Sequence, residues 1–272
     1  MWMDVFVQIR SEDFMNNGCF VRDAEEHRSP SVVRPVRGVL VPLADRRPVR
    51  VSSADVLKDL PGCTFNEVEK CGYDFVPYFT KPTLAENAKG LASLCTLAKR
   101  QIKCAEDFTG KCLDGLPKGI IGLMLKAVTN EYSMFCNTTS PKHKEYFDSI
   151  KCINKAGPDL QKCTKDMFVA TYRASKAADG QKIPYSCCYY HEFIECEEGA
   201  LNKACKHPAA KKFLHDILDH VFGEVLSFPC SKYTKGSEAC QTLPALSTKD
   251  DAKARSKGFI EPLVVISSKL SG

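Results

Sequence analysis

Residues 186–205 of the chain read SCCYYHEFIECEEGALNKAC. Within this stretch Cys188, Cys196 and Cys205 are separated by steps of 8 and 9 residues. Both steps are close to whole numbers of α-helical turns, so the three side chains fall near one side of a continuous helix, with Gly199 as a potential interruption. The stretch therefore predicts a helix that disulfides attach to its neighbours.

The same cysteine spacing occurs twice in the chain. From Cys71 the steps are 24, 9, 8 and 24 residues, and from Cys163, counted through Cys188, they are 25, 8, 9 and 25. Six positions then align between the two halves, and Cys240 and one of the adjacent pair Cys187 and Cys188 are extra in the second half. An internal duplication explains this spacing, and coincidence in a cysteine-rich chain is the alternative.

Fifteen cysteines are far more than a reducing compartment normally carries in the absence of zinc or thioredoxin-type motifs. No Cys-x-x-Cys motif occurs, so we expect disulfides and an oxidising compartment. The connectivity stays open, because six cysteines alone allow 15 pairings. We expect adjacent cysteines to take different partners. The residues predicted to form disulfides are Cys63, Cys71, Cys95, Cys104, Cys112, Cys136, Cys152, Cys163, Cys187, Cys188, Cys196, Cys205, Cys230 and Cys240.

Apolar periodicity predicts an all-α fold. Apolar side chains recur at helical spacing over 213–226 and, on a broader stripe, over 120–135, and no segment alternates as a strand does. Pro208 suits the first turn of the second of these helices, and Pro229 lies beyond its end. We predict two tandem disulfide-stapled helical bundles with irregular N- and C-terminal tails. The expected segments are 1–57 (atypical and disordered), 58–140 (first repeat), 146–240 (second repeat) and 241–272 (flexible tail).

The first 57 residues differ in composition from the rest. They contain eight arginines and no lysine, whereas residues 58–272 contain 27 lysines and three arginines. The opening MWMDVFVQIRSEDF has acidic residues where a signal peptide has its apolar core. Either the protein is cytosolic, or a start of another origin replaces the signal, and the cysteine content favours the second reading. Cys19 lies in this segment, and without it the cysteine count is even.

Two groups of polar residues are candidates for a catalytic or metal site. The string Cys187-Cys188-Tyr189-Tyr190-His191-Glu192 is similar to the Cys-Cys-x-x-His-Asp of secretory phospholipases, where histidine activates water and aspartate binds calcium. The acid here is a glutamate and no calcium loop exists, so an ordinary surface histidine is the favoured reading. His215, Asp216, Asp219 and His220 are spaced as zinc ligands, but we expect them on a solvated helix face.

We therefore expect no catalytic residues, no metal and no cofactor. Asn137-Thr138-Thr139 is an N-glycosylation sequon in a predicted loop, so Asn137 is the expected glycosylation site. No run of 18 apolar residues predicts a membrane span, and the short apolar run 262–266 does not suffice as a lipid-anchor signal. A net charge of +5 does not by itself indicate a nucleic-acid partner.

Three features resemble the arthropod 27 kDa haemolymph glycoprotein family over about residues 60–240. They are the Ser186–Tyr190 centre, the flanking 24-residue cysteine steps and the ending Phe228-Pro229-Cys230. The resemblance implies a secreted, helical, disulfide-bridged glycoprotein of body fluid or saliva, with no catalytic residues to carry over. The start of the chain departs from the family, which has a signal peptide there.

The sequence leads to one favoured function and two alternatives. Broad apolar helix faces in small bundles could leave a groove, so we expect a non-enzymatic extracellular carrier of a small hydrophobic ligand. A secreted immune or host-interaction factor that binds another protein is the alternative, and a phospholipase-like enzyme is the minor one. The identity of the ligand or partner and the oligomeric state do not follow from the sequence.

Overall fold

The computed structural model describes residues 56–227, 229–255 and 258–270. The segment expected to be atypical, including Cys19, lies outside these ranges except for its last two residues. Regular structure within the described ranges is helical and contains no β-strand, so the all-α prediction is confirmed. The α-helices are α1 (Phe65–Glu69), α2 (Ala88–Cys112), α3 (Gly115–Phe135), α4 (Pro141–Ile153), α5 (Gly157–Lys176), α6 (Lys182–Ala204), α7 (Pro208–Leu218), α8 (Glu224–Ser227), α9 (Glu238–Gln241), α10 (Asp251–Ala254) and α11 (Ile260–Ser267).

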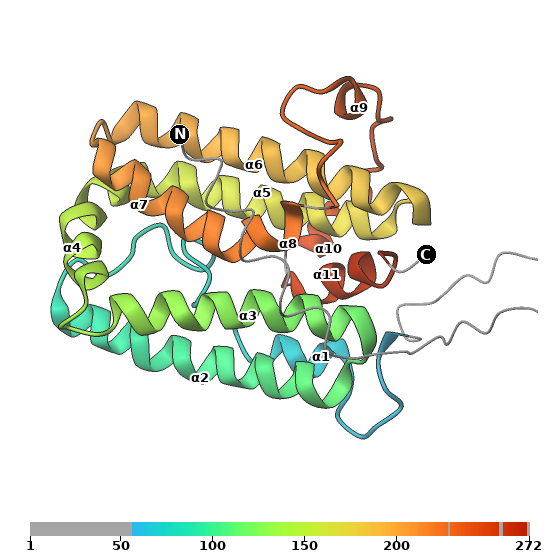
Figure 1. The fold of residues 1–272 in the computed structure, drawn as a ribbon, viewed down its shortest axis with the longest axis horizontal. Coiled ribbons are helices and arrows are strands. Elements are labelled where there is room, and N and C mark those ends of the chain that lie inside the picture. Colours follow the sequence, from blue (N-terminus) through green and yellow to red (C-terminus); the bar gives the residue numbers. More distant parts are fainter. Residues whose placement is uncertain (1–55, 228, 256–257, 271–272) are drawn as a thin grey trace, which may run out of the picture. The chain divides into compact units, whose positions relative to one another are not determined.

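The long helices form two antiparallel pairs, as Figure 1 shows for the residues drawn in colour. Helices α2 and α3 make one pair, and α5 and α6 make the other. Helix α7 packs on α4, and α11 lies between α3 and α5, so that it contacts one helix of each pair. Helices that are distant in sequence therefore meet along the space between the two pairs.

Local sequence signals explain where several helices begin. The Asn87 side chain accepts a hydrogen bond from the Gly90 amide at 2.8 Å and caps α2. Ser140 caps α4 in the same way, with a proline in the first turn. Pro208 opens α7, as predicted, and the His207 ring accepts from the Ala210 amide. These caps satisfy amides that have no partner inside the helix.

Two helices are interrupted, or remain uninterrupted, at places where the sequence pattern predicts otherwise. Helix α6 runs unbroken through Gly199 and ends at Ala204, just before Cys205. The helix expected over 213–226, in contrast, is divided into α7, a π-helical turn at Asp219–Gly223 and the short α8. The π turn adds a residue per turn, so it shifts the direction in which the side chains after Leu218 point.

Seven disulfides join all fourteen of the predicted cysteines. When the extra cysteines Cys188 and Cys240 are left out of the count, the first cysteine of each half bonds to the fifth, the second to the fourth and the third to the sixth. The bonds of the first half are Cys63–Cys112, Cys71–Cys104 and Cys95–Cys136, and those of the second half are Cys152–Cys205, Cys163–Cys196 and Cys187–Cys230. The seventh bond, Cys188–Cys240, has no counterpart in the first half.

This connectivity decides one detail that the cysteine spacing left open. Cys187, and not Cys188, is the counterpart of Cys95, because Cys187 bonds to Cys230 at the end of its repeat as Cys95 bonds to Cys136. Spacing could not decide between two adjacent cysteines, since the steps from Cys163 differ by a single residue. The expectation that the adjacent pair has different partners is met.

The two repeats share one hydrophobic core. Buried side chains of the first repeat, such as Leu91 and Ile121, belong to the same cluster as Leu160 and Phe213 of the second repeat. The cluster also contains Ile260 and Val264 of α11, which are completely buried. The expectation of a flexible tail over 241–272 is therefore wrong for α11: its apolar run was too short to interpret alone, but it packs between two helices that the sequence did not place together.

Candidate functional site

An apolar cavity lies where the two helix pairs meet. Its walls come from the 75–77 segment, from α3, α5, α6, α7 and the π turn, and from the start of α11. The cavity has a volume of about 140 Å³. The lining residues are Phe75, Val76, Pro77, Ile121, Met124, Leu125, Val128, Glu131, Tyr132, Phe135, Thr164, Met167, Phe168, Thr171, Tyr190, Phe193, Glu197, Leu214, Ile217, Leu218, Val221, Phe222, Phe259 and Leu263.

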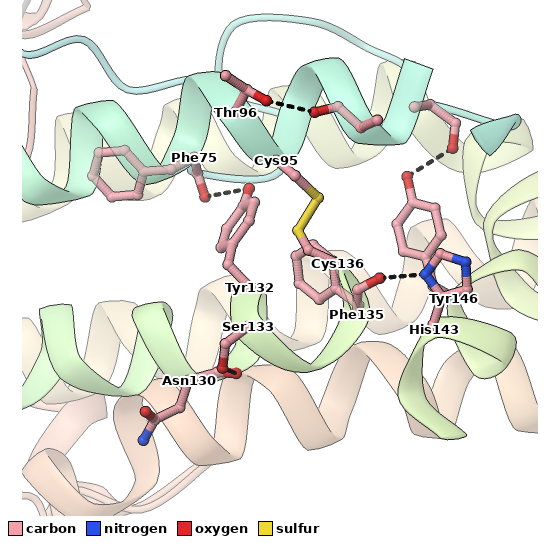
Figure 2. Close-up of a disulfide and its surroundings, with 12 residues drawn as sticks. Phe75, Cys95, Thr96, Asn130, Tyr132, Ser133, Phe135, Cys136, His143 and Tyr146 are labelled. Carbon is pink, nitrogen blue, oxygen red and sulfur yellow. Dashed lines mark hydrogen bonds between the residues drawn. A yellow bond between two sulfur atoms is a disulfide. The ribbon is translucent and has the colours of Figure 1, made fainter. Parts of the chain in front are cut away.

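A disulfide and two hydrogen bonds hold the α3 wall (Figure 2). The Cys95–Cys136 bond ties the end of α3 to α2, and close to it the Tyr132 hydroxyl donates to the Phe75 carbonyl at 3.0 Å. The His143 ring nitrogen Nδ1 lies 2.7 Å from the Phe135 carbonyl oxygen. Burial raises the pKa of the Tyr132 phenol, so this hydroxyl remains a donor at neutral pH. The disulfide and the two hydrogen bonds hold Tyr132 and Phe135 in place at the cavity wall.

One of the two carboxyl groups in the lining is paired with a lysine ammonium and a histidine ring. Glu131 is buried, and its Oε2 lies 2.7 Å from the Lys142 ammonium of α4. Its other oxygen, Oε1, lies 2.6 Å from the His220 ring of the π turn. Such contacts compensate for the removal of a carboxylate from water, so Glu131 connects three helical segments at the edge of the cavity.

The other carboxyl group has no such partners. The Glu197 side chain of α6 is 5% exposed, and its Oε2 atom makes no hydrogen bond. Burial alone raises its pKa to about 8, because the charged form loses its water without gaining a cation. At neutral pH Glu197 is therefore mostly a neutral carboxylic acid in an apolar wall.

Glu131 and Glu197 are not among the predicted site residues, although the sequence contains a signal for both. On α6 the residues that face the core are Tyr190, Phe193 and Leu201, and Glu197 occupies the same helical face between them. On α3 Glu131 has the same relationship to Val128 and Phe135. An acid within an apolar stripe is the pattern that would have found both.

The polar residues that the sequence suggests as catalytic or metal sites do not line the cavity. His191 and Glu192 do not line the cavity. Asp216 pairs with Lys212 at 2.5 Å, and the Nε2 atom of His215 lies 3.8 Å from a Glu198 carboxylate oxygen. His220 is exposed, as expected of a solvated helix face, and its Nδ1 atom also lies 2.6 Å from a Glu131 carboxylate oxygen. Among the described residues, no three His, Cys, Asp or Glu side chains are grouped as metal ligands.

Asn137 lies in the turn between α3 and α4. Its side chain is exposed, and its amide oxygen accepts a hydrogen bond from the Thr139 hydroxyl at 2.9 Å. An exposed asparagine in a turn, hydrogen-bonded to the threonine hydroxyl of its sequon, is accessible to N-glycosylation.

Comparisons with known proteins do not place the chain in a family. No family model, no curated protein and no solved structure matches it. In the ranges that the structure describes, no helix is both long and apolar enough to cross a membrane. The seven disulfides are typical of a protein of an oxidising compartment.

Proposed function

We propose that the protein is a non-enzymatic extracellular carrier that binds a small hydrophobic molecule in the cavity between its helix pairs. The single observation that carries this proposal is the composition of the cavity wall, which is almost entirely apolar and aromatic. Ligand sites for small molecules are concave, mostly apolar and equipped with a few polar groups. An empty space of this kind does not attract water, whereas an apolar ligand gains free energy by filling it.

The disulfides support a site that keeps its shape without a ligand. Cys95–Cys136 fixes the end of α3, and Cys163–Cys196 fixes α5 to α6, so three wall helices are covalently attached to a neighbour. A cavity in a protein tends to be reduced by relaxation of its walls. Disulfides between the wall helices restrict that relaxation. They also restrict the unfolded chain, and each disulfide thereby contributes roughly 2–4 kcal/mol to stability.

An extracellular setting is the second part of the proposal. Disulfides persist in oxidising environments, and the exposed Asn137 would carry a glycan there. The resemblance to the arthropod 27 kDa haemolymph glycoproteins is in keeping with this setting, and we propose body fluid or saliva as the place of action. A carrier that circulates in such a fluid needs both a stable fold and a shielded apolar interior.

Titration with a neutral fluorescent hydrocarbon tests the carrier function. The delipidated protein is titrated with diphenylhexatriene, and we expect saturable binding with one site. Val128→Trp, which places a large ring in the cavity, should weaken binding about tenfold or more, equivalent to roughly 1.4 kcal/mol. Leu123→Trp is the matched control, because Leu123 lies on the same helix, is 53% exposed and is not part of the wall.

The control decides what a loss of binding means. Unchanged binding in Leu123→Trp together with weakened binding in Val128→Trp places the probe in the cavity. Equal binding by the two variants, with helical circular dichroism preserved in both, would show that the probe lies elsewhere and that the cavity is not the carrier site.

A further inference from the structure

Among the described residues, the cavity lining has carboxyl groups but no basic side chain of its own. Its lining, within the part of the chain that the structure describes, includes two carboxyl groups and no lysine, arginine or histidine. Glu131 already faces Lys142 and His220 at its own side. Glu197 is the carboxyl without a cation, and it is more than nine-tenths buried.

Two hydroxyl groups of the wall already have hydrogen-bond acceptors, so they differ from Glu197. The Tyr132 hydroxyl donates to the Phe75 carbonyl, and the Thr171 hydroxyl donates to the Met167 carbonyl at 2.8 Å. Both hydroxyls are therefore engaged with the backbone. A buried polar atom that has no partner costs free energy, and a ligand group that pairs with it recovers that cost.

From this geometry we propose that the preferred ligand is an apolar amine, whose ammonium group pairs with the Glu197 carboxylate while its hydrocarbon part fills the cavity. The inference rests on the proposed carrier function and specifies its ligand class. An ammonium supplies the positive charge that the wall lacks, and it donates to an oxygen that has no donor. A ligand carboxylate would bring a negative charge into a wall whose described residues include no lysine, arginine or histidine to pair with it, so we expect it to be rejected.

Proton balance gives the amine a distinctive signature. Below pH 8 Glu197 holds a proton, so binding of an alkylammonium ion forms the ion pair and releases that proton to solvent. Below about pH 8 the loss of the Glu197 proton opposes binding of the amine. The affinity for the amine should therefore rise with pH up to about pH 8 and then level off. The ionisable groups near Glu197 are the phenols of Tyr78 and Tyr190 and, across the cavity, Glu131 with Lys142 and His220. Burial raises the pKa of both phenols, so they stay neutral in this range.

Competition among three ligands of one chain length tests the proposal. Dodecylamine, dodecanol and dodecanoate, each below its aggregation concentration, displace diphenylhexatriene from the protein at pH 7. We expect dodecylamine to bind about tenfold or more tightly than dodecanoate, with dodecanol between them. Equal or tighter binding of dodecanoate would overturn the proposal.

Variants assign the preference to Glu197. Glu197→Gln keeps the shape of the side chain but cannot become an anion, so it should lose about tenfold in affinity for dodecylamine and keep its affinity for dodecanol. Glu198→Gln is the matched control, because Glu198 is the next residue of α6 and its side chain is 42% exposed. An unchanged amine affinity in Glu197→Gln would contradict the inference.

A measurement on the unmodified protein gives the same answer independently of the variants. Calorimetry in buffers of different ionisation enthalpy should show close to one proton released per dodecylamine bound at pH 7 and none at pH 9. Absence of proton release at pH 7 would count against pairing with Glu197. If diphenylhexatriene itself does not bind, the carrier function is wrong; if it binds without a preference for the amine, only this inference is wrong.

Discussion

Cys187 and Cys188 are neighbours on α6, yet their disulfides lead to different parts of the chain. Cys187 bonds to Cys230, which follows α8, and Cys188 bonds to Cys240 in α9. The first bond belongs to the pattern that the two repeats share, and the second is peculiar to the second repeat. One point of α6 thus anchors two segments of the chain.

Removal of the Cys188–Cys240 disulfide, which has no counterpart in the first repeat, should have a local effect. In the Cys188→Ser, Cys240→Ser double variant the α9 segment loses its covalent attachment, and α9 has no buried residue to replace it. We expect faster proteolysis within 231–243 and a loss of stability at or below the usual range of about 2–4 kcal/mol. Mass spectrometry of the first cleavage products checks this, and early cleavage in α2 or α3 would contradict a local effect.

Glu197 should make stability depend on pH. Its pKa is about 8 in the folded protein, against the ordinary 4.5 that it regains on unfolding. Below pH 4.5 both states hold the proton; between the two values only the folded state does, so the free energy of unfolding falls as pH rises, by at most about 1.4 kcal/mol per pH unit. This stability is lost once the pH exceeds 8.

Urea unfolding at several pH values between 5 and 8 measures this slope. Glu197→Gln cannot ionise, so its free energy of unfolding should decrease less with pH than that of the unmodified protein. Glu198→Gln, which alters an exposed acid, should retain the original slope. Parallel curves for the Glu197 variant and the unmodified protein would show that this carboxyl is not the cause.

Gly157 opens α5 directly against the backbone of the 81–84 segment. A Cβ atom at this position would lie 1.8 Å from the Pro82 carbonyl oxygen, and that backbone must move to admit it. We expect Gly157→Ala to destabilise the protein by about 1–3 kcal/mol. Gly199→Ala is the control: its Cβ meets nothing within 4 Å, so the helix should gain roughly 0.4–1 kcal/mol. Thermal melts of the two variants should shift in opposite directions, and a shift in the same direction would contradict the close approach.

Asn154 joins the start of the second repeat to the chain before α2. Its side-chain oxygen accepts from the Leu84 amide at 2.9 Å and from the Tyr78 hydroxyl at 3.1 Å, and its amide donates to the Leu84 carbonyl at 2.9 Å. Asn154→Ala leaves buried groups without partners, and each such group costs about 1–3 kcal/mol.

Chemical denaturation of this variant beside Asn130→Ala measures the cost. Asn130 is exposed on α3, so its replacement should change the free energy of unfolding by less than about 0.5 kcal/mol. A similar small change for Asn154→Ala would mean that water replaces the lost bonds.

Much of the architecture was readable from the sequence because it depends on local pattern. Helical periodicity identified α3 and α7, and cysteine content identified the fourteen residues that form bonds. Pro208 marked a helix start because a proline in the first turn loses no hydrogen bond. These signals lie within one or two helical turns, so no knowledge of distant neighbours was needed.

The partners of those residues depended on the tertiary structure. Spacing allowed many disulfide pairings, and the packing of helices selected one in which Cys187, and not Cys188, corresponds to Cys95. The role of α11 was equally hidden, since eight residues acquire a buried position only when α3 and α5 are present on either side. The candidate site is of the same kind: Glu197 is an unremarkable acid in sequence and becomes a buried, unpaired carboxyl because helices from both repeats converge on it. Local pattern determines which segments are helices and which cysteines bond, whereas a cavity and its polar wall exist only after distant helices have packed.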